Sequence, residues 1–179
     1  QESTEEEVAS VEHGPFTGYT ESCGFPDPRE ASPANVRSAL RQIIGKDGPL
    51  TRASVFRLYV EGCPGLQRVG RSVRLSLNRV LGTMLRAGEI VMENELGDAS
   101  ADWQVLRLKG TPKVRERPAG RRDLSEIPPS ELHLVLDRLE ASSLFEELDE
   151  EHLARKLLEH YGFVRLTAIR RKYLSKVIN

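Results

Sequence analysis

Basic and amide side chains recur along one side of a predicted helix near the middle of the chain. They lie within residues 65–86 and are Gln67, Arg68, Arg71, Arg74, Asn78, Arg79 and Arg86. Arginine pairs with guanine edges or phosphates, and asparagine pairs with adenine. The first two residues fall in the turn before the helix, where contacts to phosphate are common. The pattern predicts a nucleic-acid-binding face; the alternative is a solvated basic face that packs against another domain.

Two further groups of basic residues extend this prediction. One group lies in residues 110–125 and contains Lys113, Arg115, Arg117, Arg121 and Arg122. The other lies near the end of the chain and contains Arg165 and Arg171. The first stretch is expected either to lie along a phosphate backbone or a minor groove, or to be only a solvated tether. The expected partner is DNA, with RNA as the alternative.

The net charge of −1 conceals a strong asymmetry along the chain. Residues 33–122 carry seventeen basic and eight acidic side chains, a net charge of +9. Residues 1–32 carry −7 and residues 123–179 carry −3. A segment at +9 inside a nearly neutral chain is a candidate polyanion surface. The alternative is that these arginines only keep a small domain in solution.

Motifs for catalysis, cofactors or metals are absent from the sequence. It contains neither a phosphate-binding GxxxxGK[ST] loop nor a GxGxxG motif, and its two cysteines form no zinc quartet. The four histidines are scattered, at His13, His133, His152 and His160. We therefore expect a region that is not an enzyme and needs no cofactor or metal.

Location and context are predicted from equally simple features. No apolar run approaches the roughly 18 residues of a membrane span, and no signal peptide opens the chain. These features favour a cytoplasmic protein without a membrane partner. The chain begins with Gln1 and not with methionine, so we expect it to be part of a longer polypeptide.

The sequence repeats itself after about 97 residues. Residues 65–81 read GLQRVGRSVRLSLNRVL, and residues 162–178 read GFVRLTAIRRKYLSKVI. The pairs that match without a gap include Gly65 and Gly162, Arg68 and Arg165, Arg74 and Arg171, Leu77 and Leu174, Arg79 and Lys176, and Val80 and Val177. Upstream, Pro33 answers Pro129. This period is too long for a solenoid repeat and indicates two copies of a small domain.

The first copy, residues 32–109, is predicted to be a winged-helix module. Ser32 and Thr51 are suitable N-caps for its first two helices, and a third helix spans about 70–87. Alternating apolar residues then predict a β-hairpin up to residue 108, with a short strand also expected at Leu50. Three helices followed by a hairpin are typical of winged helices, in which the second and third helices form a helix-turn-helix.

The hairpin tip is acidic, because it carries Glu93, Glu95, Asp98 and Asp102. Wings that bind DNA are usually basic, since they lie along phosphates. The acidic tip therefore suggests that the wing faces a protein, or that only the helix and the linker contact nucleic acid.

The remaining segments complete a mainly α fold with a small β-hairpin, built as tandem winged-helix or helix-turn-helix-like modules. Residues 1–31 are predicted to be an acidic extended arm, partly anchored by Phe16, Tyr19 and Phe25. Residues 110–125 are a basic linker rich in Pro and Gly, and residues 126–179 are a second module of three helices without a wing. We expect the second module to pack against the first or a second copy, chiefly through Leu139, Leu144 and Phe145.

The second module resembles a domain of unknown function near the C-terminal end of large bacterial superfamily 1 helicase-like proteins. The resemblance rests on EIPPSELHLVLDRL and LDEEHLARKLLEHYGFVRLTAIRRKYL, and the first module matches the same pattern at residues 48–49, 65–68 and 70–74. In that family the modules can occur in tandem, beyond an ATPase core and an endonuclease-like domain. This sequence departs from the pattern at Thr167, which replaces the turn glycine, and in the missing second wing.

The resemblance implies an accessory, DNA-related role without ATPase or nuclease activity in this region. The hypothesis is a non-catalytic nucleic-acid-binding region of a helicase-like DNA-processing protein that uses the third helix of the first module. The alternative is a protein–protein interaction platform that docks onto the ATPase core or a partner subunit.

Overall fold

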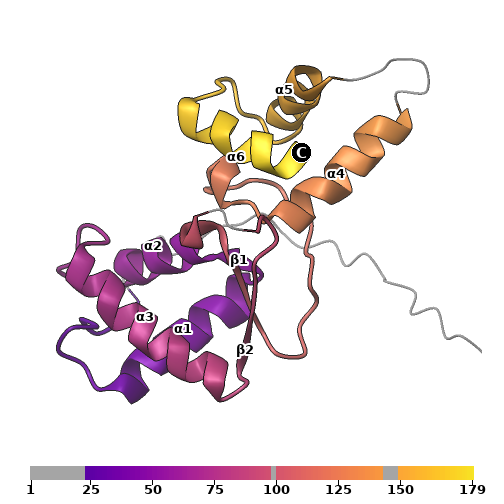
Figure 1. The fold of residues 1–179 in the computed structure, drawn as a ribbon. Helices are drawn as coiled ribbons and strands as arrows, with labels where there is room; N and C mark the ends of the chain where they lie inside the picture. The colour runs from indigo at the N-terminus through magenta and orange to yellow at the C-terminus, as the bar shows by residue number, and fades with distance from the viewer. Residues whose placement is uncertain (1–22, 98–99, 143–148) are drawn as a thin grey trace, which may run out of the picture.

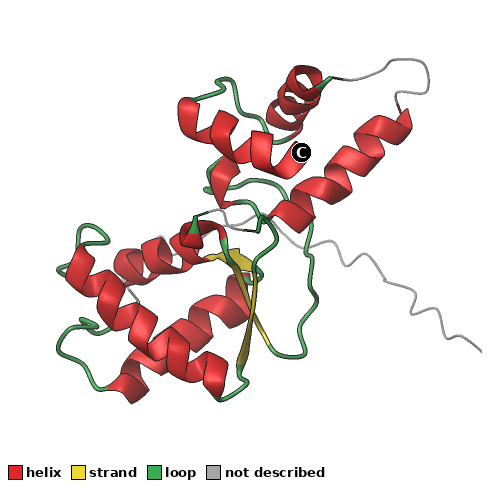
Figure 2. Ribbon diagram, in the orientation of Figure 1, coloured by secondary structure: helices red, strands yellow, loops and turns green. Residues whose placement is uncertain are grey.

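The protein is mainly helical, with six α-helices and a small three-stranded antiparallel sheet in the residues that the structure describes (Figures 1 and 2). The structure is a computed structural model, and it describes residues 23–97, 100–142 and 149–179. Two separate hydrophobic cores divide these residues. We call residues 25–108 the first unit and residues 119–178 the second unit.

Three helices form the body of the first unit: α1 (Pro33–Asp47), α2 (Arg52–Gly62) and α3 (Arg71–Arg86). The side chains of Ser32 and Thr51 cap α1 and α2 by accepting hydrogen bonds from backbone amides, as the sequence predicted. The apolar faces of the helices meet in one core, where each fully buried large apolar side chain contributes roughly 1.5–3 kcal/mol. Its completely buried members include Leu40, Ile43, Phe56, Tyr59, Leu77 and Met84.

The sheet covers one end of these helices. Its strands are β1 (Leu50–Thr51), β2 (Ile90–Glu93) and β3 (Val105–Leu108), arranged in the order β1-β3-β2. The hairpin and the short strand at Leu50 were both predicted, and together they make one antiparallel sheet. Before the last strand, Ala101–Trp103 form a 3-10 turn, η1, capped by the Ser100 side chain.

The second unit consists of a 3-10 turn, η2 (Leu124–Glu126), and three helices. The helices are α4 (Pro129–Ser142), α5 (Glu150–His160) and α6 (Ala168–Ile178). No strand occurs in the described residues of this unit.

The internal repeat is visible in the positions of the helices. Helix starts at residues 33, 52 and 71 of the first unit correspond to starts at 129, 150 and 168 of the second. The turns before α3 and α6 each contain a glycine with a positive φ, +88° at Gly65 and +75° at Gly162. Only glycine adopts this conformation without steric cost. The helices and turn glycines of the two units therefore recur at nearly the same spacing.

The start of the described chain packs onto the first unit. Phe25 is buried, its backbone amide donates to the Gly62 carbonyl at 2.9 Å, and its ring lies 5.5 Å from that of Tyr59. A Cβ on Gly62 would lie 2.4 Å from the Phe25 ring, so this close approach requires glycine. Phe25 is therefore an anchor, as expected, whereas Phe16 and Tyr19 lie outside the described residues.

Residues 115–122 differ from the flexible linker that the sequence suggested, because they are held at several points along their length. The Arg115 guanidinium donates to the Gly48 carbonyl at 2.7 Å, and Arg117 is buried and donates to the Asp47 carbonyl. Arg122 is also buried. Proline, glycine and arginine suit a solvated tether equally well, so local sequence does not reveal these contacts, which reach almost 70 residues back along the chain.

Arg122 and Glu131 form a buried ion pair between this segment and the beginning of α4. Two parallel contacts join them, Nη1 to Oε2 at 2.7 Å and Nη2 to Oε1 at 2.8 Å. The remaining donors of Arg122 bind the carbonyls of residues 117, 118 and 119. Glu131 also accepts the backbone amide of Arg117 at 3.2 Å. A bidentate pair fixes direction as well as distance, so it sets how the segment enters α4.

The second unit packs against the first, as expected, but through different residues. Leu96 and Trp103 from the hairpin loop lie against the second core, and the Trp103 ring is 5.0 Å from that of Tyr173. Leu139 packs on the core of its own unit. The other two expected contact residues, Leu144 and Phe145, lie outside the described residues. In the described residues, the hairpin loop thus makes the contact between the units that was predicted for the end of α4.

We expect Glu131→Gln to lower the free energy of unfolding by about 3–5 kcal/mol, because it leaves the Arg122 charge buried and uncompensated. The control is Glu116→Gln, whose partner Arg138 is exposed, and which should cost only about 0–1 kcal/mol. Urea unfolding followed by circular dichroism measures both. Equal effects of the two substitutions would contradict the role of the buried pair.

Candidate nucleic-acid interface

The outer side of α3 is the centre of the candidate interface. With 3.6 residues per turn, six residues fall within an arc of about 100° opposite the buried side of the helix. We call these residues the α3 face: Arg71, Leu75, Asn78, Arg79, Gly82 and Arg86. The buried side, which carries Leu77 and Met84, holds the helix against the core and thereby keeps the α3 face toward solvent.

Three arginines at this face have unoccupied guanidinium groups. Arg68, in the turn, and Arg71 and Arg79, on α3, are exposed, and no carboxylate of the described residues lies within 4.0 Å of them. Arg86 is exposed, and its guanidinium lies 3.4 Å from the Thr83 hydroxyl. Charges without a carboxylate partner among the described residues are available to a ligand at no cost of breaking an ion pair there.

The other predicted residues of this region differ in their exposure and in their partners. Gln67 is exposed in the turn beside Arg68, and Asn78 is half-buried on the α3 face. Arg74 lies at the edge of α3, where it is ion-paired with Asp102 and its guanidinium is 5.5 Å from the centre of the Phe56 ring. Arg74 therefore serves the contact between α3 and η1, and is less available than Arg71.

The acidic residues of the hairpin are used within the protein. Asp102 pairs with Arg74, as described above. Glu95 accepts the backbone amide of Ser130 at 2.8 Å, so its carboxylate lies at the N-terminus of α4, where negative charge is favourable. Glu93 lies 3.4 Å from Arg107 and 3.7 Å from Lys113. Asp98 lies outside the described residues.

These contacts account for the acidic residues of the hairpin. Glu95, Leu96 and Trp103 contact the second unit, whereas Asp102 and Glu93 pair with basic side chains elsewhere.

Two of the predicted nucleic-acid contacts in residues 110–125 are in conflict with the structure. The guanidinium groups of Arg117 and Arg122 are buried and bound to groups of the protein, so neither reaches a ligand on the surface. Arg115 is half-buried and donates to two backbone carbonyls. Lys113 and Arg121 are exposed.

Arg117 and Asp47 show that burial at these internal positions disfavours the charged forms of the side chains. Their closest charged atoms are 3.8 Å apart, and both side chains are almost fully buried. Burial lowers the pKa of Arg117 to about 10, and burial raises the pKa of Asp47 against the opposing effect of Arg117. Arg117 remains protonated at neutral pH, so its charge is committed to this internal contact.

In the second unit, Arg165 and Arg171 are both exposed, but their surroundings differ. Arg171 lines a groove of about 200 Å³ between α5 and α6, together with Glu150 and Glu151. Arg165 lies in the turn before α6, where its backbone carbonyl accepts a hydrogen bond from Arg170. The acidic groove weakens the case for Arg171 as a contact to a polyanion.

Sequence reasoning missed a basic groove beside the α3 face. Arg37 and Arg41 of α1 line a cavity of about 530 Å³ together with Arg79. Glu89 lies between the first two, 3.1 Å from Arg37 Nε and 3.5 Å from Arg41. The sequence did contain an indication of this basic side of α1, because Arg37 and Arg41 are four residues apart and such residues lie on one side of a helix.

The described residues form neither a metal-binding cluster nor a helix suited to crossing a membrane. Within the described ranges, no group of three or more His, Cys, Asp or Glu side chains is arranged to hold a metal ion. None of the helices in those ranges combines the length and apolarity that crossing a membrane requires. The chain matches no protein-family model, no curated protein and no solved structure.

Gly82 lies in the middle of the α3 face without a packing role. A Cβ there would meet only the end of the Arg86 side chain, at 3.7 Å. We expect Gly82→Ala to raise the free energy of unfolding by about 1 kcal/mol, the difference in helix propensity. Gly88→Ala is the matched control: its φ of +67° should make the same substitution destabilising by roughly 1–2 kcal/mol. Urea unfolding should give opposite signs, and a loss of stability in Gly82→Ala would contradict this description of the α3 face.

Proposed function

We propose that the chain is a non-catalytic, nucleic-acid-binding region of a larger helicase-like DNA-processing polypeptide, and that the α3 face is its principal contact. The observation that carries this proposal is the set of unoccupied arginines, Arg68, Arg71 and Arg79, on one exposed helix and its turn. They belong to a segment whose net charge is +9. The exposed position of Gln67 beside them adds a polar donor at the level of the turn.

The order of elements supports a winged-helix interpretation of the first unit. The chain runs α1-β1-α2-α3-β2-β3, and the sheet has the order β1-β3-β2. In helix-turn-helix proteins the helix after the turn enters the major groove, which is about 12 Å wide and admits one α-helix. By this interpretation α3 is the recognition helix, and the second unit is a wingless copy.

The spacing on α3 suits a contact with duplex DNA. Arg71 and Arg79 are eight residues apart, or about 12 Å along the helix axis. In this proposal the arginines bind phosphates or guanine edges, Asn78 is placed for a base edge, and Leu75 meets an apolar group such as a thymine methyl. The side chain of Leu75 is 59% exposed, so it is free to make such a contact.

The helicase context rests on the sequence resemblance, and the tandem helix-turn-helix path is compatible with it. In such a polypeptide this region would hold nucleic acid while catalysis takes place elsewhere.

A protein–protein interaction platform is the second candidate, and the groove between α1 and α3 favours it. This groove has a partly apolar floor, formed in part by Pro33, Ala34 and Val80, and lies next to exposed Leu75. Docking onto an ATPase core or a partner subunit through this surface would depend on apolar contacts and only weakly on salt. Polyanion binding depends steeply on salt, so the two candidates differ in a measurable way.

We expect the triple variant Arg68→Gln, Arg71→Gln and Arg79→Gln to weaken binding to a labelled DNA duplex. Each phosphate contact contributes about 0.9 to the slope of log affinity against log salt, so the slope should fall by up to about 2.7. Fluorescence anisotropy between about 50 and 200 mM salt measures it. The charge-matched control is Lys109→Gln, Arg138→Gln and Arg155→Gln, which are all exposed and are not part of the α3 face. No binding by the unmodified protein at low salt, or equal losses in both variants, would refute the proposal.

A further inference from the structure

We propose that the polyanion surface continues from the first unit onto α6, so that one duplex contacts both units at once. The contacts in the second unit are Arg165, Lys172 and Lys176, and Arg171 is not among them. This inference rests on the proposed function, because it extends the same surface.

The first observation is that free cations recur at equivalent places in the two units. The turn glycines Gly65 and Gly162 are each followed three residues later by an exposed arginine, Arg68 and Arg165. In the following helix, Arg79 has its counterpart in Lys176, which is also exposed. In the part of the chain that the structure describes, none of these charged groups has a carboxylate within 4.0 Å.

The second observation is that the two helix-turn-helix elements are clamped to one short turn, η2. On one side, Arg57 of α2 binds Glu126, with Nε to Oε1 at 2.6 Å. On the other side, Arg170 of α6 binds Asp123, with Nη2 to Oδ2 at 2.6 Å. Asp123 and Glu126 also form a capping box with each other. They are three residues apart, so the two anchor points are separated by about 10 Å at most.

The clamp extends directly to the turn of the second unit. Arg170 donates from Nη1 to the Arg165 carbonyl at 2.7 Å, and its guanidinium lies 4.3 Å from the centre of the Phe163 ring. Arg165 therefore has a fixed position relative to α2, which leads into the turn that carries Arg68. A second contact joins the units beside this clamp, where the Trp103 ring lies 5.0 Å from the Tyr173 ring. A rigid arrangement allows both basic surfaces to bind one ligand without an additional ordering cost.

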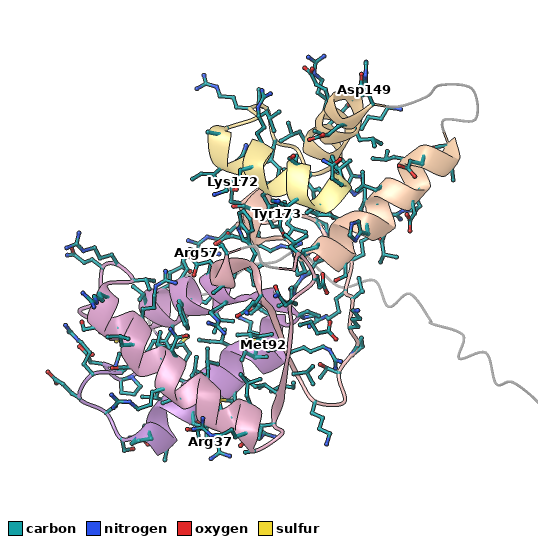
Figure 3. The ribbon with its side chains drawn as sticks, viewed as in Figure 1. Arg37, Arg57, Met92, Asp149, Lys172 and Tyr173 are labelled. Carbon is teal, nitrogen blue, oxygen red and sulfur yellow. The ribbon has the colours of Figure 1, made fainter. Side chains whose placement is uncertain are left out.

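The third observation selects one edge of α6. Arg171 and Ser175 line the groove shared with Glu150 and Glu151, so that edge faces carboxylates of α5. Lys172 and Lys176 are one helical turn apart and lie away from this groove. In the view of Figure 3, Lys172 is labelled at the edge of α6 that lies nearer the first unit, where Arg57 is labelled on α2. Lys172 and Lys176 therefore belong to the edge that continues toward the first unit.

The experiment compares two double variants with the same charge change in the second unit. Lys172→Gln with Lys176→Gln removes the proposed contacts, and Arg171→Gln with Arg155→Gln is the control on the opposite edge and on α5. Each is titrated in the full chain with a labelled duplex of about 24 base pairs, and with one of about 8 base pairs, which is shorter than a helical turn of about 10.5.

With the long duplex, we expect the lysine variant to lose about 1.8 in salt slope, at about 0.9 per phosphate contact. Between about 50 and 200 mM salt, the affinity of the unmodified protein should then fall about tenfold more than that of this variant. The arginine control should keep the slope of the unmodified protein. With the short duplex the lysine variant and the unmodified protein should agree, because one unit suffices to cover it.

The outcomes separate this inference from the proposed function. If the unmodified protein binds but the two double variants behave alike, or the loss is the same on the short duplex, the continuous surface is wrong and the α3 face stands. If the unmodified protein binds neither duplex, both proposals are wrong.

Discussion

The buried Arg122–Glu131 pair is the contact on which the arrangement of the two units depends. It closes residues 117–122 into a fixed loop at the start of α4, since Arg122 also binds three carbonyls of that loop. A pair with no exposed surface contributes little net stability, because desolvation cancels most of its attraction, but its loss is costly. The pair matters here because its two parallel contacts fix the direction in which the chain enters α4. With the entry into α4 fixed, Glu95 reaches the N-terminus of that helix and Arg57 reaches η2.

The arginines therefore fall into two populations that net charge does not distinguish. Arg57, Arg74, Arg117 and Arg122 bind groups of the protein. For Arg57, burial opposes the charged form, yet hydrogen bonds and charge from Glu126 and Glu61 outweigh it and raise the pKa. The second population, on the α3 face and its turn, has no such partners among the described residues. A net charge of +9 thus overstates the surface that a ligand meets, and the position of each arginine decides its use.

Local sequence predicted the helices well, because caps, apolar periodicity and turn glycines are local properties. Ser32 and Thr51 cap their helices through their side chains as predicted, and Asp149 and Thr167 cap α5 and α6 in the same way. Arg71 and Arg79 were found for the same reason, since a helical period assigns their side of α3. The burial of Arg117 and Arg122 was not predictable in this way. It depends on carbonyls at Asp47 and on Glu131, which become neighbours only when both units fold. The helical spacing of Arg37 and Arg41 is visible in the sequence, but the groove that they form with Arg79 was not predicted.

The hairpin loop of the first unit joins the two units, because it packs on the core of the second. A unit of about 60 residues buries too little apolar surface to be independently stable with ease, and the second has no strand among its described residues to cover its helices. The hairpin loop of the first unit supplies that cover through Leu96 and Trp103. The hairpin and its loop thus pack on the cores of both units. Carboxylates of the same loop bind Arg74 and the N-terminus of α4, so the acidic residues of the hairpin serve contacts within the protein.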